Sequence, residues 1–158
     1  MNNKANINAI RFISIILLFS VFTQILLGAA VRLTNSGLSC PDWPLCYGMI
    51  LPTRNSLLDL ANINYNYFQI MLEWVHRFNA AIIIGPLIIV LFILIYLIRK
   101  SKIILWRLVL LTVSLLTLQG LLGGLTVIKS NAPWSVTIHL ICAFLLFGVI
   151  LCLLLSTE

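Results

Sequence analysis

The sequence predicts an all-α integral membrane protein, a bundle of four transmembrane helices. Of its 158 residues, 61% are hydrophobic and only 9% are charged, and the mean hydropathy is +1.11. That balance lies far outside the range of soluble globular domains. Four apolar stretches are visible, at about residues 12–31, 70–98, 103–128 and 135–155. Each is long enough as a helix to cross a hydrocarbon layer roughly 30 Å thick, so we expect a single four-helix membrane domain over residues 1–158.

Basic residues predict the orientation of the four helices. Six of them flank the same ends of the apolar stretches: Lys4, Arg11, Arg99, Lys100, Lys102 and Arg107. The opposite side has Arg32, Arg54 and Lys129, spread over more chain. Cytoplasmic loops are enriched in Lys and Arg, so both termini are expected on the cytoplasmic side, in a bacterial cytoplasmic membrane. The net charge of +6 then reflects the basic residues that flank the helices on the cytoplasmic side, and no nucleic-acid partner is expected.

The first apolar stretch is expected to stay in the protein as an uncleaved helix. Residues 28–30 read Gly-Ala-Ala, which resembles the small-residue cleavage site of a signal peptide. The apolar run before this site, however, is longer than the roughly 7–15 residues of such signals.

The two histidines of the chain, His76 and His139, lie early in the second and fourth apolar stretches. These two helices run in the same direction, so both imidazoles are expected at one depth near the outer face of the membrane. Glu73 shares a helical face with His76, and Ala80 and Ala143 follow the histidines by one turn. Ionisable groups in membrane helices are costly and tend to mark functional sites. One histidine alone is equally well interpreted as structural, but two at matched depth beside a glutamate favour metal ligation.

A short internal repeat supports the same arrangement. Residues 24–29 read QILLGA and residues 119–124 read QGLLGG, so four of six positions match. Each copy precedes a helix that carries a histidine. Parallel repeats are related by an axis along the membrane normal and place sites at their interface, which would bring the two imidazoles into opposition. The alternative is that these glycines only permit close helix packing.

The outer segment of residues 32–69 contains a cysteine pair, Cys40 and Cys46, in a stretch with two prolines and flanking glycines. Such residues favour defined turns. Because the outer compartment is oxidising, a disulfide is the expected state. The five intervening residues exceed the C-x-x-C redox spacing, so a structural staple and a redox-active pair both stay open.

The donor set favours haem over other metal centres. A di-iron carboxylate bundle needs two Glu-x-x-His motifs and two further glutamates, but Glu73 is the only acidic residue inside an apolar stretch. A zinc site would need a third or fourth ligand. Two opposed imidazoles, His76 and His139, supply both axial ligands of a haem iron. Arg77 and Arg32 at the outer rim either pair with the haem propionates or anchor their helices at the interface.

Four motifs resemble the heme A synthase family: GAAVRLTNSG at 28–37, CPDWPLCYG at 40–48, EWVHR at 73–77 and QGLLGG at 119–124. The resemblance covers nearly the whole chain. It implies an oxidoreductase that oxidises a ring methyl of haem O to formyl, giving the haem A of terminal oxidases. It also implies His76 and His139 as axial ligands, Glu73 as the catalytic carboxylate beside the reacting methyl, and Cys40–Cys46 as an outer-loop disulfide.

The chain departs from that family in length. Most members resemble two four-helix halves in tandem, one for the substrate haem O and one holding haem b as an electron carrier. This chain resembles the N-terminal half, with haem b as a second candidate cofactor. Three interpretations stay open: a homo-oligomer, a subunit with a separately encoded second half, and a truncated gene. Membrane lipid, a haem O synthase and a terminal oxidase are the other expected partners.

Two functions from other classes also stay open. A bis-histidine b-type cytochrome that only carries electrons would explain the histidines, but it leaves Glu73 and the cysteine loop without a role. A four-helix thiol oxidase would exchange its outer cysteines with partner proteins, but it would need a closer pair and a second outer pair. Conversion of haem O to haem A separates the enzyme from the cytochrome.

Overall fold

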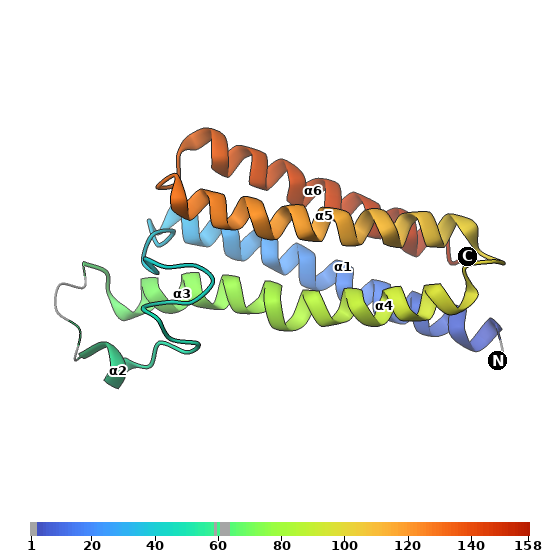
Figure 1. Cartoon of the computed structure of the whole chain (residues 1–158), viewed down its shortest axis with the longest axis horizontal. Helices are drawn as coiled ribbons and strands as arrows, with labels where there is room; N and C mark the ends of the chain where they lie inside the picture. The colour runs from blue at the N-terminus through green and yellow to red at the C-terminus, as the bar shows by residue number, and fades with distance from the viewer. Residues whose placement is uncertain (1–2, 59, 61–63) are drawn as a thin grey trace.

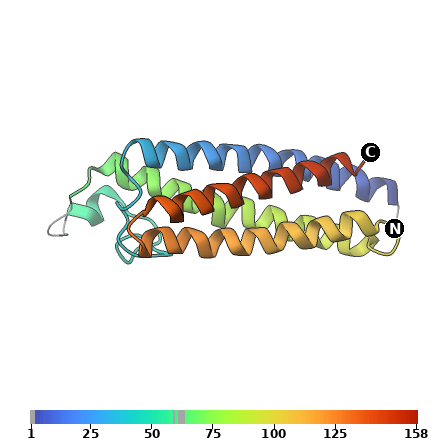
Figure 2. The same cartoon turned by 90° about the horizontal axis from the view of Figure 1, so that it is seen from above.

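Four long helices lie side by side along the molecule, and a loop region caps one end (Figures 1 and 2). The structure is a computed structural model that describes residues 3–58, 60 and 64–158. Its helices are α1 (Asn3–Leu33), α2 (Arg54–Leu58), α3 (Tyr67–Phe78), the π-helical segment η1 (Asn79–Ile84), α4 (Gly85–Ile98), α5 (Ile103–Ile128) and α6 (Pro133–Leu155). Segments α3, η1 and α4 form one continuous span. Four spans are long and apolar enough to cross a membrane, which confirms the predicted fold class.

The predicted boundaries hold except at the start of the chain. Helix α5 has the predicted bounds, and the second and fourth spans begin at Tyr67 and Pro133, only a few residues before the predicted starts. Helix α1, however, begins at Asn3 instead of residue 12. Residues 3–11 contain no glycine or proline, so the helix continues beyond the part that hydropathy can identify as crossing lipid.

The second span begins with a capping box and changes its helical pitch near the middle. The side chain of Asn66 accepts from the backbone N–H of Gln69, and the Gln69 side chain accepts in return from the N–H of Asn66. These bonds satisfy two N–H groups that a helix start leaves without partners. Further along, Pro86 has no N–H to donate and its ring crowds the preceding turn. The backbone before it takes the wider π pattern, in which the N–H of Gly85 bonds to the carbonyl of Ala80.

The helices pack as a closed square in which the two histidine-bearing helices are diagonal to each other. Helix α1 packs against α3, α4 and α6, while α5 packs against α4 and α6. Helices α3 and α6 both start at the loop end and run toward the end that holds the termini (Figure 1). They are therefore parallel, as the sequence predicted, and they face each other across the centre of the bundle.

The close-packed core is confined to the half of the bundle near the termini. Its buried members are Ile10, Leu17, Val21, Ile84, Ile88, Leu91, Ile95, Ile98, Leu105, Val109, Leu146, Ile150 and Leu153. All of them lie closer to the terminal end than the two histidines do. A second, small cluster of buried residues, Cys40, Cys46, Leu57 and Ile70, lies in the loop region. The two histidines lie between these two clusters.

Both termini lie at the same end of the bundle (Figure 2), where Arg11 and Glu158 form an exposed ion pair at 3.4 Å. From the excess of Lys and Arg at this end we predict that it is cytoplasmic. A green fluorescent protein fused after Glu158 should fluoresce, and alkaline phosphatase fused after Leu58 should be active, since it needs disulfides that form outside. If the phosphatase were active after Glu158 and inactive after Leu58, the predicted orientation in the membrane would be wrong.

Candidate functional site

His76 is held against α1 by three contacts. The side-chain amide of Gln24 donates to the backbone carbonyl of His76 at 2.8 Å, and the same nitrogen lies 3.4 Å from His76 Nε2. The carbonyl oxygen of the Gln24 side chain accepts in turn from Asn79 Nδ2 at 2.8 Å. A Cβ at Gly28 would lie 3.1 Å from His76 Cε1. A side chain at position 28 would therefore crowd the imidazole.

His139 makes the corresponding contacts with α5. Gln119 Nε2 donates to the backbone carbonyl of His139 at 3.2 Å and lies 3.5 Å from His139 Nε2. A Cβ at Gly123 would lie 3.5 Å from His139 Cε1. The sequence repeat is thus also a repeat of contacts. In each copy the glutamine binds a histidine from the neighbouring helix, and the glycine four residues later faces the ring.

Each imidazole keeps one nitrogen without a partner. Nδ1 of His76 and Nδ1 of His139 are buried and make no hydrogen bond to any described residue. Buried polar atoms in folded proteins are nearly always bonded. A group that accepts a lone pair from each ring would therefore complete the site.

The donor set suits haem iron. Two imidazoles from diagonal helices match the two axial positions of a haem. The close-packed core near the termini ends before it reaches the level of the two histidines. Among residues 3–58, 60 and 64–158, no three His, Cys, Asp or Glu side chains gather in the way a protein-only metal site requires. The residues present thus fit a planar metal macrocycle clamped from two sides.

Glu73 is buried, with 4% of its surface exposed, and its carboxylate accepts from three donors. Oε2 accepts from the Ser39 hydroxyl at 3.0 Å and from the Cys40 backbone N–H at 2.8 Å. Oε1 pairs with the Arg77 guanidinium at 2.6 Å. The predicted catalytic carboxylate therefore also ties the cysteine loop to α3.

The Arg77 side chain binds main-chain carbonyl groups of the same loop. Its two terminal nitrogens donate to the carbonyl oxygens of Asp42, Leu45 and Cys40, in addition to Glu73. Since a guanidinium has five N–H donors, only the Nε–H remains for another acceptor. A bidentate bond from Arg77 to a propionate would compete with these contacts. The sequence did not indicate this arrangement, because main-chain carbonyls carry no signature in a sequence.

The cysteine loop is closed by a disulfide between Cys40 and Cys46, which are 0% and 1% exposed. The Asp42 carboxylate accepts from the backbone N–H groups of Tyr47 and Gly48, at 2.6 and 2.8 Å. Both residues have positive φ, 54° and 71°, a conformation that suits glycine at the second position. Disulfide and carboxylate together give the loop a fixed shape.

The loop also reaches across to α5. A Cβ at Gly124 would lie 3.4 Å from the ring of Trp43, so the indole rests on bare backbone there. Position 124 corresponds to Ala29 in the first repeat, one of the two positions at which the copies differ. The loop thus contacts α5 through Trp43 and is bound to α3 through Arg77 and Glu73. Sequence reasoning missed this contact, although the departure from the repeat at Gly124 was its visible signal.

The remaining predicted residues lie apart from these contacts. Arg32 ends α1, is exposed, and makes no side-chain hydrogen bond with any described residue. Ala80 and Ala143, predicted one turn below the histidines, are half-buried in η1 and α6.

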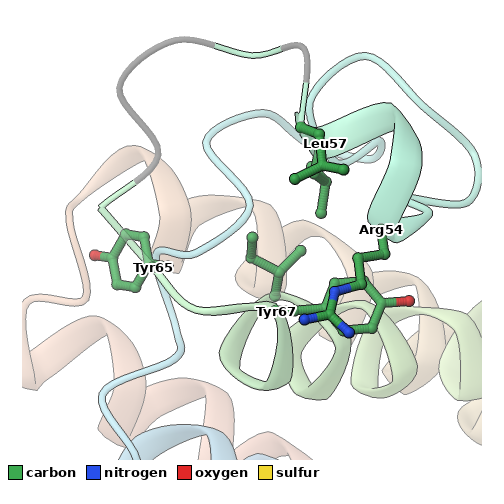
Figure 3. A pocket seen from close by; sticks show the side chains of 6 residues that line it. Arg54, Leu57, Tyr65 and Tyr67 are labelled. Atoms are coloured by element: carbon green, nitrogen blue, oxygen red, sulfur yellow. The ribbon is translucent and has the colours of Figure 1, made fainter.

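A separate hollow of about 210 Å³ lies between α2 and the start of α3. Its lining is Arg54, Leu57, Leu58, Tyr65, Tyr67 and Ile70, and Figure 3 shows that these side chains come from the loop region and the first turn of α3. It contains neither histidine, glutamine nor glutamate, so it is distinct from the histidine site.

Comparison with known proteins identifies the family. The model of the COX15-CtaA family, described as cytochrome oxidase assembly protein, matches residues 11–158. The chain belongs to this family. It is 37% identical over 146 residues to the heme A synthase of Shewanella oneidensis, covering 87% of this chain and 43% of that protein. It is 30% identical to the heme A synthases of Oceanobacillus iheyensis and Bacillus pumilus, covering 94% and 92% of this chain but 42% and 44% of theirs.

The chain therefore spans less than half the length of the curated relatives that it matches. No solved structure matches it.

The contacts of Arg77 predict a strong effect on the loop. Arg77→Gln leaves the Glu73 carboxylate buried without its cation, and breaking a buried pair in this way costs about 3–5 kcal/mol. The thermal midpoint in detergent should fall, and the Cys40–Cys46 disulfide should be reduced faster by dithiothreitol. Arg32→Gln is the matched control, because Arg32 is exposed, and it should change neither measurement. Equal behaviour of the two variants would contradict the assigned role of Arg77.

Proposed function

We propose that this COX15-CtaA family member oxidises a ring methyl of haem O to formyl, giving haem A for a terminal oxidase. His76 and His139 are the proposed axial ligands. The observation that carries the proposal is the matched pair of histidines, each held by a glutamine and a glycine and each with a buried nitrogen that lacks a partner. The relatives named heme A synthase supply the substrate class.

Glu73 is the proposed catalytic carboxylate. Bound haem O would supply the methyl group, water would supply the formyl oxygen, and the electrons removed would pass to an electron carrier. Glu73 would accept a proton released as the methyl group is oxidised. The Arg77 guanidinium and the Cys40 N–H fix the carboxylate in place. The hydroxyl of Ser39 can rotate to donate or accept, so its bond to Oε2 can persist whether Glu73 is charged or protonated.

The arginines are proposed to play unequal roles at the rim. Arg32 has all of its donors available to a propionate, whereas Arg77 offers only its Nε–H and acts mainly through the loop. A carboxylate prefers the bidentate fork of a free guanidinium. With the termini cytoplasmic, this rim lies at the outer face of the membrane.

The disulfide is proposed as a brace for the loop. Thiol–disulfide exchange requires access of the attacking thiolate to a sulfur, and both Cys40 and Cys46 are buried. Exchange with a partner protein would require the loop to open. This argues against the thiol-oxidase alternative and favours the structural interpretation of the pair.

The chain spans less than half the length of its relatives, and both proposed axial ligands lie within it. A second four-helix unit, whether a second copy, a separately encoded half or the missing part of a truncated chain, is therefore proposed for electron removal and not for ligation. A haem b in that second unit is the proposed electron carrier. The b-type cytochrome alternative explains the two histidines, but it does not explain the buried Glu73 and its loop partners.

The direct test is expression of the chain together with a haem O supply, in a host without its own heme A synthase. Mass analysis of the extracted pigment should show haem A with the wild-type chain. His76→Ala and His139→Ala should each lose most of the bound pigment, because each removes an axial ligand. Haem O recovered unchanged at full occupancy would leave a haem-binding protein without the proposed activity. Absence of any haem would reject the site itself.

A second test separates catalysis from binding. Glu73→Gln should keep bound haem but lower conversion at least about 100-fold, the scale of general acid–base contributions. Ser39→Ala is the matched control, since it removes one bond to the same carboxylate and leaves its charge in place. It should retain most of the conversion. If Glu73→Gln converts haem O at the wild-type rate while haem binding is intact, the assignment of Glu73 is wrong.

A further inference from the structure

Two glutamines, Gln24 and Gln119, contact the histidines, and the function proposed so far uses these contacts only to describe the site. We propose that they are positioning residues that fix the orientation of the ligand imidazoles. The inference rests on the proposed function only in taking His76 and His139 as haem ligands. Neither glutamine is proposed to touch the reacting atoms.

The first step of the argument is the bond from each glutamine to a main-chain carbonyl. Gln24 donates to the carbonyl of His76 across the α1–α3 contact, and Gln119 donates to that of His139 across the α5–α6 contact. A hydrogen bond between membrane helices fixes how one helix is rotated against the other. Because each bond ends on the histidine residue itself, it fixes the rotation at the position of the ligand.

The second step is the contact with the ring. The same amide nitrogens lie 3.4 Å from His76 Nε2 and 3.5 Å from His139 Nε2. Since an amide N–H only donates, this approach restricts a ligand imidazole by packing and not by accepting its N–H. The edge of each ring at Cε1 faces a glycine. A Cβ would lie 3.1 Å from the ring at Gly28, which is tighter than an ordinary contact, and 3.5 Å from the ring at Gly123, which is an ordinary contact. Each imidazole is thus held between an amide and a bare stretch of helix, which limits its rotation about the bond to Cβ.

The third step is the difference between the two sites. The carbonyl oxygen of Gln24 is bonded to Asn79, whereas that of Gln119 is buried without a described partner. Asn79 comes three residues after His76, and the corresponding position after His139 is Cys142, whose thiol instead faces the carbonyl of Leu115. Both copies of the repeat therefore have the glutamine–histidine contact, although only Gln24 has a described partner for its side-chain carbonyl. Retention of only the shared part indicates that the contact with histidine is what matters.

A glutamine that merely joins two helices would explain the bonds to the carbonyls, but not the repeated position beside a ring nitrogen. The two roles differ in what a substitution changes. Loss of a packing bond lowers stability, whereas loss of a group that orients a metal-bound histidine also changes the ligand orientation. Loss of such orienting groups typically costs about 10–100-fold in metal affinity.

The experiment uses the full chain, purified in detergent and loaded with ferric haem b as the probe. The variants Gln24→Met and Gln119→Met keep the side-chain length and remove the amide. We expect haem to leave each variant about 10-fold faster, measured by transfer to apomyoglobin. The low-spin electron paramagnetic resonance signal, which depends on the orientation of the imidazole planes, should also shift. None of these measurements requires conversion of haem O.

The matched controls are Ser20→Ala and Thr117→Val, which each remove a bond from a side chain to a carbonyl within α1 or α5 and touch no histidine. They should leave the haem release rate and the resonance signal as in wild type. If the methionine variants do not fold, Gln24→Asn and Gln119→Asn keep an amide that is one carbon too short to reach, and the same changes are expected.

Unchanged release and unchanged signal in folded Gln24 and Gln119 variants would overturn the inference. Equal changes in the controls would overturn it too, because the effect would then be one of general packing. Failure of the wild-type chain to show a bis-histidine low-spin signal would instead reject the proposed function. The outcome for the glutamines is therefore separable from the outcome for the enzyme.

Discussion

The ion pair between Glu73 and Arg77 is the interaction on which the outer half of the structure depends. Lipid offers no hydrogen bonds, and a buried ion pair is favourable only when further hydrogen bonds satisfy both partners. Here the loop supplies them, with the Ser39 hydroxyl and the Cys40 N–H bound to the carboxylate and main-chain carbonyls bound to the guanidinium. The shape of the loop and the position of the buried ion pair therefore depend on each other.

The fold could be predicted from the sequence because its main signal is local. Hydropathy located four spans within a few residues, except at the start of α1, where the helix extends past the apolar stretch. The parallel arrangement of α3 and α6 followed from counting spans. The π-helical segment before Pro86 was not predicted, since a proline in a membrane helix is compatible with several local adjustments.

The site could be predicted only in part, and the missing part has a physical cause. His76, His139 and Glu73 were selected as candidate site residues because ionisable side chains are rare within spans. The partners of Arg77 were missed because they are carbonyl groups, which every residue has. The glutamines lay inside the repeat, but a repeat shows only that two segments are alike. Their contact with histidine required the arrangement of α1 beside α3 and of α5 beside α6.

The two halves of the repeat differ where their chemistry would matter. Helix α3 carries Glu73 and Arg77 around its histidine, whereas the corresponding positions of α6 are Val136 and Leu140. The disulfide loop is likewise bound to α3, and it touches α5 through Trp43. A flat ligand held between two equivalent imidazoles would therefore meet a charged, hydrogen-bonding wall on one side and an apolar wall on the other. Under the proposed function, oxidation of one methyl among several around a nearly symmetric ring would require such a difference, and the asymmetric walls would provide it.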